Sequence, residues 1–267
     1  NNLSVGANFS YLYGDITHQS MTTIGATDTR SIKLDKFSIS DYKLDFGLQY
    51  TYKLNKKNTI NIGAVYTLGR TLHGDAYKYH QTGAESNGSI YVQSQTGDTI
   101  PNPFKMPHTF GIGLTYVYDN RLTIGVDYTL QKWNTADLAW SKFNKESVEM
   151  NSRTKIAFGA EFVPSYISHN YLKRIRYRMG AYCSSPYNKV SYTSPDTGTT
   201  SFQDGAREYG VSIGFGLPMF QSKSMLNISG QYIKVSPKFK GLMEENYLRI
   251  NIGLTFNERW FMKWKVD

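Results

Sequence analysis

The sequence predicts an all-β protein, namely a transmembrane antiparallel up-and-down β-barrel of which about ten strands are present here. Three observations predict it. Apolar and polar residues alternate with period two in about ten segments, many of them about 9–13 residues long, whereas strands of globular proteins average roughly 5–6. Aromatic residues such as Tyr11 and Tyr13 gather near the segment ends, where a membrane interface would lie. The intervening positions carry mostly Gly, Ser, Thr, Asn and charged residues, which suit a polar interior.

The expected strands follow one another along the whole chain, which we therefore treat as a single domain over 1–267. The last is the cleanest, because Leu248, Ile250 and Leu254 alternate with Arg249 and Gly253. In chain order the predicted strands are 3–13, 42–52, 60–68, 110–118, 122–130, 156–162, 175–183, 209–217, 226–232 and 248–256.

Long and short connections alternate between these segments. A barrel of the outer membrane has short periplasmic turns and longer extracellular loops, so the alternation predicts which end of each strand faces outward. The long connections are 15–40, 70–106, 135–150 and 187–206, with a medium one at 236–245, and the short ones are 55–57, 119–120, 165–170 and 221–223. A soluble lipocalin-like or sandwich fold stays open as an alternative, but it would leave the long polar loops unexplained.

Composition narrows the class of protein. Hydrophobic residues make up 40% of the chain. The sequence contains no run of about 18 apolar residues, so it predicts no membrane-spanning helix. The net charge of +9 is spread over loops and strand faces, which fits outer-membrane lipid headgroups and lipopolysaccharide better than nucleic acid. Cys183 has no second cysteine to pair with and is expected to be a small residue on a strand.

The chain enters a strand pattern at once, from Asn1 to Val5, without a basic segment, an apolar core or a cleavage site. A barrel protein has to be exported. We therefore expect the start of the gene product to lie outside this sequence.

The final predicted strand has the features of a closing β-signal, an alternating strand that ends in an aromatic residue. The residues of this signal are Tyr247, Leu248, Ile250, Ile252, Leu254 and Phe256. In the tail that follows, Trp260, Phe261 and Trp264 alternate with basic residues and are expected to anchor the chain at the headgroup level.

Four stretches of the chain resemble the FadL-like long-chain fatty-acid transporter family, in the form seen in Bacteroidetes. They are 5–14, the hairpin 107–133 with Gly125-Val126-Asp127-Tyr128 and Gln131-Lys132-Trp133, the strand 209–218, and 245–247 together with 257–261. The resemblance implies a 14-stranded barrel with an N-terminal hatch that plugs the lumen. It therefore implies that about four strands and the hatch precede Asn1, and that this chain is the C-terminal portion of such a barrel.

No arrangement of side chains predicts catalysis, and we expect neither an enzyme nor a cofactor. The five histidines are spread over loops and strand ends. His73, Asp75 and His80 share one long connection and could meet around a cation, but their spacing matches no standard metal site. A solvated loop is the interpretation that we favour, so no metal site is predicted.

Charged residues on the non-lipid face form the first candidate site. Arg174, Arg176 and Arg178 alternate with apolar residues, so all three are expected to point into the lumen. They could form an anion-attracting constriction, or they could pair with lumenal acids in an ionic network. We favour the network, whose candidate acids are Asp45, Asp127 and Glu161.

Glycines form the second candidate site. Gly210, Gly214 and Gly216 occupy one face of a strand that ends at Pro218, and Gly and Pro permit a kink. In the family that the chain resembles, distortion of a strand opens the wall sideways. Close packing on this face explains the same glycines, and the sequence does not separate the two interpretations.

Two functions are consistent with these features of a protein of the bacterial outer membrane. The first is passive passage of small hydrophobic molecules across that membrane, as the resemblance implies. The alternative is a non-catalytic accessory or scaffold barrel in a larger secretion or barrel-assembly complex with other outer-membrane proteins. In that case the long connection 70–106 would be a contact surface, and a charged interior favours this second function.

Overall fold

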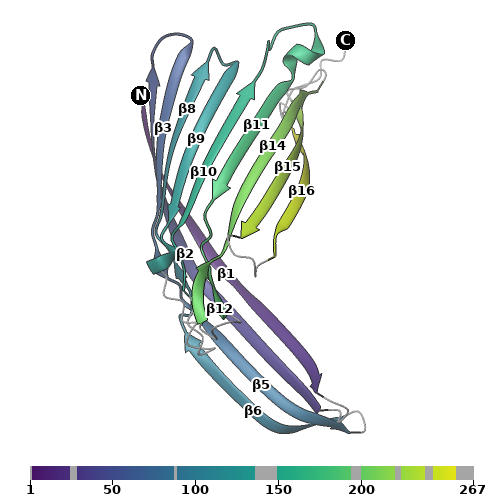
Figure 1. Ribbon diagram of the computed structural model, residues 1–267. Helices are drawn as coiled ribbons and strands as arrows, with labels where there is room; N and C mark the ends of the chain where they lie inside the picture. The colour runs from purple at the N-terminus through teal and green to yellow at the C-terminus, as the bar shows by residue number, and fades with distance from the viewer. Residues whose placement is uncertain are drawn as a thin grey trace, which may run out of the picture.

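Antiparallel strands make up most of the computed structural model (Figure 1). The structure describes residues 2–24, 29–86, 89–135, 149–193, 200–219, 224–237 and 243–256. Sixteen strands lie in these residues, and twelve of them form one sheet. This confirms an all-β fold built on a large antiparallel meander.

The strands of the large sheet are β1 (Leu3–Ile24), β2 (Thr29–Lys53), β3 (Asn58–Thr67), β5 (Gly74–Ser86), β6 (Ser89–Pro101), β8 (Thr109–Tyr118), β9 (Leu122–Gln131), β10 (Arg153–Phe162), β11 (Arg176–Ser184), β14 (Ala206–Pro218), β15 (Met225–Pro237) and β16 (Glu245–Thr255). Two short pairs join β4 (Arg70–Thr71) to β7 (Lys105–Met106) and β12 (Lys189–Thr193) to β13 (Thr200–Asp204). The 3₁₀ helices are η1 (Trp133–Thr135) and η2 (Tyr171–Arg174).

Each strand predicted from the sequence falls on one strand of a continuous meander, which we call the wall; only Leu68, Ile175 and Phe256 lie one residue beyond the observed strand ends. The wall runs in the order β1, β2, β3, β8, β9, β10, β11, β14, β15 and β16, and each strand pairs antiparallel with the next. Its short turns include the one between β8 and β9, where Asp119 and Asn120 adopt positive φ values of 49° and 54°. Asp and Asn tolerate this left-handed conformation better than most residues do.

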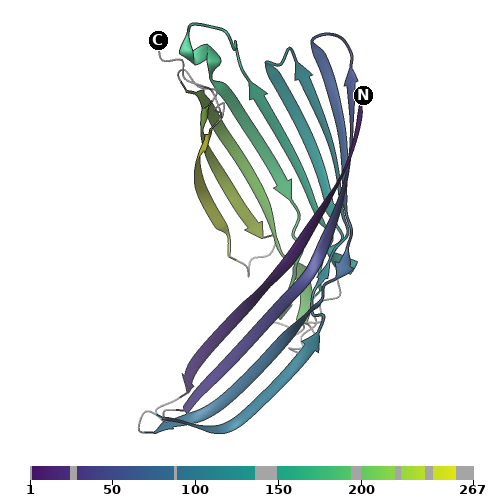
Figure 2. The ribbon, with the colours of Figure 1, turned by 180° about the vertical axis from the view of Figure 1, so that it is seen from behind.

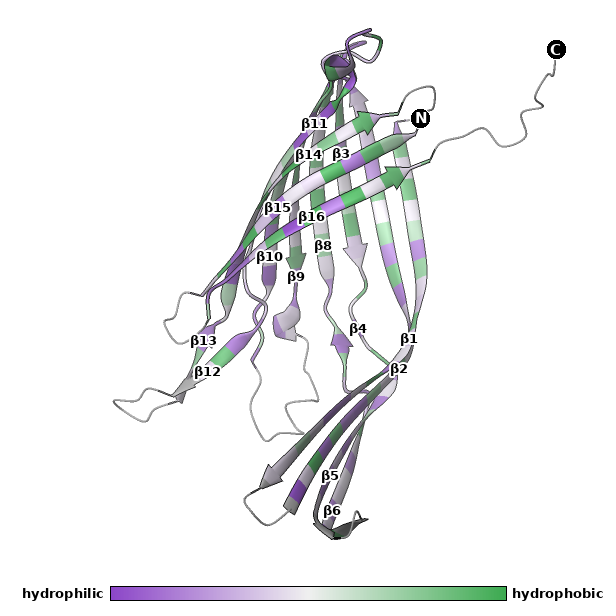
Figure 3. Ribbon diagram, turned by 90° about the vertical axis from the view of Figure 1, so that its right-hand side faces the viewer, coloured by the Kyte–Doolittle hydropathy of each residue, from purple (hydrophilic) through white to green (hydrophobic). Residues whose placement is uncertain are grey.

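The pairing register separates the wall into an apolar face and a polar face. Val5 lies opposite Leu48, Leu48 opposite Ala64, Ala64 opposite Ile112 and Ile112 opposite Tyr128, so one row of apolar side chains crosses five strands. Residues between these positions point to the other side, because successive side chains of a strand alternate. The alternation is visible as bands of opposite hydropathy along β15 and β16 (Figure 3).

The wall does not close into a barrel within the described residues. β1 and β16 are its two edges, and no strand pairing joins them (Figure 3). The sequence predicted about ten strands of a probable 14-stranded barrel, and the structure shows ten wall strands in a curved open sheet. Backbone groups at an open edge have no partner in hydrocarbon, so a membrane-embedded wall needs further strand pairing at both edges.

Three connections that the sequence predicted as loops contain paired strands, and that prediction was wrong. The connection 187–206 holds the short β12–β13 pair. Between 15 and 40, β1 continues to Ile24 and β2 begins at Thr29, and between 70 and 106 the chain forms the β5–β6 hairpin. We call the sheet formed by β5, β6 and the parts of β1 and β2 within 14–40 the extension. Its strands carry polar residues on both faces, which weakens the period-two contrast that identifies a strand.

β2 joins the wall to the extension by changing its partner. Its residues from Asp45 to Lys53 pair with β3, and its residues from Thr29 to Ile39 pair with β5 on the same side. β1 follows β2 without a register shift over both parts. The extension therefore projects from the end of the wall that carries the long connections (Figures 1 and 2).

No helix among the described residues is long and apolar enough to cross a membrane.

Candidate functional site: the polar face of the wall and the junction

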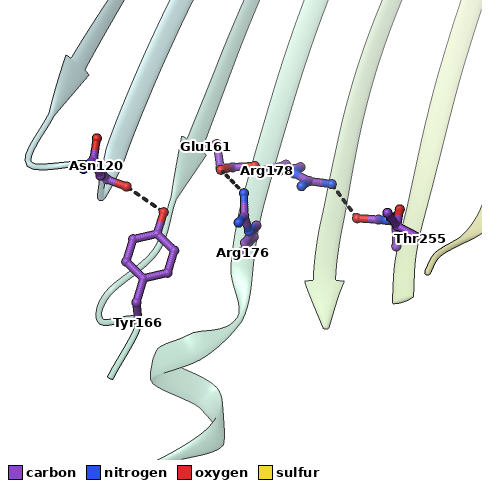
Figure 4. Close-up of polar contacts among 7 residues, drawn as sticks. Asn120, Glu161, Tyr166, Arg176, Arg178 and Thr255 are labelled. Carbon is purple, nitrogen blue, oxygen red and sulfur yellow. Dashed lines mark hydrogen bonds and ion pairs between the residues drawn. The ribbon is translucent and has the colours of Figure 1, made fainter. Parts of the chain in front are cut away.

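Three charged side chains from two neighbouring strands meet on the polar face. Glu161 on β10 accepts hydrogen bonds from Arg176 Nη1 at 3.2 Å and from Arg178 Nε at 2.6 Å, both on β11 (Figure 4). Arg178 Nη1 also donates to the side chain of Asn227 on β15 at 2.8 Å. We call these four residues the Glu161 cluster. Arg176 and Arg178 thus pair with Glu161 on the polar face, and that this face lines a lumen stays a prediction.

The reach of Arg178 across β14 depends on a glycine. Arg178 lies opposite Gly214 in the register, so no side chain on that strand stands between Arg178 and Asn227. The cluster carries two guanidinium groups and one carboxylate, which leaves a net charge of +1. Because the three charged side chains are 26% to 38% exposed, water screens the ion pairs, and each contributes about 1 kcal/mol or less.

Arg174 does not belong to this cluster, which corrects the predicted ladder of three arginines. The chain forms η2 up to Arg174, and β11 begins only at Arg176. The side chain of Asn170 caps η2 by accepting a hydrogen bond from the backbone N–H of Leu172 at 3.0 Å. Arg174 instead lies near the Tyr171 ring, with Cζ 5.5 Å from its centroid.

The other two acids predicted for the network do not meet the arginines. Asp45 on β2 binds Lys43 at 2.9 Å and the hydroxyl of Thr67 at 2.6 Å. Asp127 on β9 lies on the same face, but none of the ion pairs in the described part of the chain includes it. Alternation thus placed both carboxylates on the correct face, while the distance between strands keeps them apart from β11.

A second polar cluster was missed in the sequence. Tyr182 on β11 donates a short hydrogen bond to Glu208 on β14, and Glu208 lies 3.7 Å from Arg153 on β10. Arg153 Nε also donates to Ser184 Oγ at 2.8 Å. The alternation places all four side chains on the polar face, but only the register shows that they are neighbours.

The glycines of β14 make room for side chains of the adjacent strands. A Cβ on Gly210 would lie 2.1 Å from the Tyr182 ring, and one on Gly216 would lie 3.0 Å from Met225 Sδ and 3.1 Å from Arg176 Cβ. β14 pairs with β15 from Ala206 to Pro218 without a register shift. Close packing therefore accounts for Gly210 and Gly216, and a lateral opening at Gly214 or Pro218 stays a prediction.

The junction between the wall and the extension is held by a buried carboxylate. Asp41 is 5% exposed, and it accepts hydrogen bonds from the backbone N–H groups of Tyr42 at 2.7 Å and His73 at 2.8 Å. Arg70 lies 3.3 Å from the same carboxylate and stacks over the Tyr42 ring at 3.9 Å. Although burial opposes it, these donors and the guanidinium hold the pKa of Asp41 below its usual range.

The histidine-rich connection does not form a cation site. His73 lies 3.5 Å from Asp41, whereas Asp75 and His80 are on β5. Their positions differ by five, an odd number, so the two side chains point to opposite faces of the strand. No group of three or more His, Cys, Asp or Glu side chains in the described ranges could hold a metal ion.

The terminal β-signal forms a strand, but its proposed anchors lie outside the described residues. Tyr247 to Leu254 belong to β16, which pairs with β15 on one side and leaves its other edge open. Phe256 follows the end of that strand and is 73% exposed. Trp260, Phe261 and Trp264 are not among the described residues.

These features define a class of protein. A long antiparallel meander with one apolar face, one polar face and short turns at one end is the kind of wall from which outer-membrane barrels are built. Within this class the chain belongs to the BamG family, whose family model matches residues 1–267. A search of the curated proteins finds no match.

Two solved structures are similar to this chain. One is CymD, a monoaromatic hydrocarbon channel, with a TM-score of 0.47 and 12% identity over 88% of this chain. The other is the RagAB peptide transporter, with a TM-score of 0.37 and 12% identity over 90% of this chain. The chain covers 65% of the length of the channel and 35% of the transporter. At these TM-scores neither likeness bears on function.

Proposed function

We propose that this chain is a non-catalytic accessory subunit of the barrel-assembly complex in the bacterial outer membrane. Membership of the BamG family over residues 1–267 is the observation that carries the proposal, because the family's name indicates a component of that complex. In this proposal the wall is part of a closed transmembrane barrel. Its open edges at β1 and β16 are then paired with further strands or with each other.

The polar face supports a scaffold more than a conduit for hydrophobic molecules. The Glu161 cluster and the cluster around Glu208 place five charged side chains on β10, β11 and β14. Lys43 and Asp45 add a further ion pair on β2. A small apolar molecule gains nothing from contact with such groups, and charged side chains pair across strands to stiffen the wall. Passage of hydrophobic molecules, the first hypothesis from the sequence, therefore becomes the second candidate.

The extension supports a role in contacts with other proteins. Its four strands form a single layer within the described residues. Its β6 edge has no strand partner in the described part of the chain, and Met21, Tyr77 and Val92 are 57%, 38% and 51% exposed. Exposed Tyr and Met side chains are enriched at protein interfaces.

The experiment is purification of the tagged protein from its native membranes in mild detergent, followed by mass spectrometry of what accompanies it. We expect stoichiometric amounts of the other barrel-assembly components. A lone barrel that carries a hydrophobic small molecule would contradict the proposal and favour passage.

Depletion of the protein provides a second test. We expect depletion to reduce the amount of several unrelated outer-membrane barrels, whereas loss of a transport channel would leave barrel assembly unchanged and slow the uptake of its substrate.

A further inference from the structure

The apolar face of the wall contains an open hollow of about 560 Å³. It spans β1, β2, β3, β8 and β9, and its lining is almost entirely apolar. Ala64 lies within it, between the larger side chains of Leu48 and Ile112 on the neighbouring strands. The small side chain of Ala64 thus leaves a depression between larger residues.

Aromatic rings close the hollow on the side of the long connections. Tyr66 and Phe110 are 5.0 Å apart between ring centroids, and Phe46 lies opposite Tyr66 in the register. Phe110 is the second residue of β8, at the end of that strand away from the β8–β9 turn. The hollow therefore lies in the half of the wall that carries the long connections, which is the outward half if short turns face the periplasm.

Basic side chains flank this aromatic rim. Lys132 is exposed, and its Nζ lies 5.4 Å from the centroid of the Phe110 ring. Its backbone N–H donates to the carbonyl of His108 at 3.0 Å, which fixes where the side chain leaves the sheet. None of the ion pairs found in the described residues includes Lys132. Arg70 stands on the other flank, over the Tyr42 ring.

We propose that the hollow is a binding site for one acyl chain of an anionic, phosphate-bearing lipid of the outer leaflet. The chain would lie over Ala64, between the side chains of Leu48, Ile112 and Tyr128. The phosphate would lie at the rim, where Lys132 supplies a positive charge that no acidic side chain of the described residues pairs with. An apolar depression with a cation directly beyond its rim matches a lipid, whose apolar chain and charged head are joined in the same order.

The inference rests on the outer-membrane location in the proposed function, but not on the assembly role. Its test uses the full protein in mild detergent, with phosphatidylglycerol and phosphatidylcholine added as probes and bound lipid counted by native mass spectrometry. Ala64→Phe should fill the hollow and lower the retention of both lipids about tenfold, the effect of losing the contacts of about two methylenes. Lys132→Gln should lower the retention of phosphatidylglycerol about fivefold and leave phosphatidylcholine unchanged.

Matched variants separate binding from folding. Ala181→Phe enlarges another exposed alanine on the apolar face, outside the hollow, and Lys57→Gln removes a charge from a turn at the opposite end. Both should retain lipid as the unaltered protein does, and all four variants should show the same heat-modifiable band in gel electrophoresis.

Equal retention by Ala64→Phe and Ala181→Phe would overturn the site. Equal retention of the two lipids by the unaltered protein would overturn the role of Lys132. An intact assembly complex without bound lipid would overturn this inference and leave the proposed function standing, whereas a lone barrel with specifically bound lipid would do the reverse.

Discussion

The wall and the extension share the strands β1 and β2, but different physical constraints act on the two regions. In the wall, β1 and β2 expose large apolar residues on one face, such as Val5 at 76% and Leu48 at 49%. Within the extension the same strands carry Thr, Ser, Lys and Asp on both faces. A strand in hydrocarbon needs an apolar face, whereas a strand in water needs only paired backbone groups and a soluble surface.

The wall and the extension acquire their stability from different interactions. In the proposed function the membrane covers the apolar face of the wall, and ion pairs and glycines organise the polar face. The extension depends on backbone pairing and on the junction at Asp41, because no second sheet packs on it in the part of the chain that the structure describes. The same kind of substitution should therefore have effects of different size in the two regions.

The largest effect is expected from a charge on the apolar face. Val126 in the wall and Val92 in the extension are 44% and 51% exposed, so Val126→Arg and Val92→Arg are matched changes. Val126→Arg should destabilise the protein in lipid vesicles by about 2–4 kcal/mol, because the arginine loses its hydration at mid-membrane. Val92→Arg should stay within about 0.5 kcal/mol. Urea unfolding in vesicles measures both, and equal losses would mean that the two faces share one environment.

The space for a side chain beside a glycine differs between the two regions. A Cβ on Gly210 would lie 2.1 Å from the ring of Tyr182. One on Gly97 would lie 3.1 Å from the Tyr77 hydroxyl oxygen and 3.7 Å from the ring, the latter an ordinary van der Waals distance. We expect Gly210→Ala to cost about 1–3 kcal/mol and Gly97→Ala to cost less than about 0.5 kcal/mol. Thermal unfolding in detergent compares them. A neutral Gly210→Ala would show that Tyr182 moves away freely.

The junction should couple the two regions. Asp41→Ala leaves the backbone N–H groups of Tyr42 and His73 without their acceptor, and we expect a local loss of about 1–2 kcal/mol. Hydrogen exchange should speed up in the extension and stay unchanged in the wall. Asp15→Ala, an exposed position on the extension, is the control and should change neither. Faster exchange in the wall as well would show that the junction also supports the wall.

The smallest effect is expected in the Glu161 cluster. Glu161→Gln removes the carboxylate shared by Arg176 and Arg178, and screening by water limits the loss to about 1 kcal/mol. The melting temperature should fall at low salt, and the difference from the unaltered protein should shrink as salt rises. Glu149→Gln, which breaks a more exposed pair with Lys189, should have a smaller effect. If the difference in melting temperature did not depend on salt, the loss would come from altered packing and not from the lost ion pairs.

Alternation in the sequence determined the side of the sheet on which each wall residue lies. It located the ten strands of the wall, it placed Arg176, Arg178 and Glu161 on one face, and it separated them from the apolar residues. The reason is that side-chain direction along a strand repeats every two residues, whatever the strand pairs with. The same rule placed Arg174 on that strand wrongly, because the cap at Asn170 starts a 3₁₀ turn there.

Only the tertiary structure decided which residues on a face are neighbours. The register brings Glu208 to Tyr182 and Arg153, places Ala64 between Leu48 and Ile112, and keeps Asp45 and Asp127 away from β11. The exchange of strand partners along β2, and therefore the extension, could not be predicted from the sequence either. Pairing depends on contacts between segments far apart in the chain, and strands with polar residues on both faces carry no period from which those contacts could be inferred.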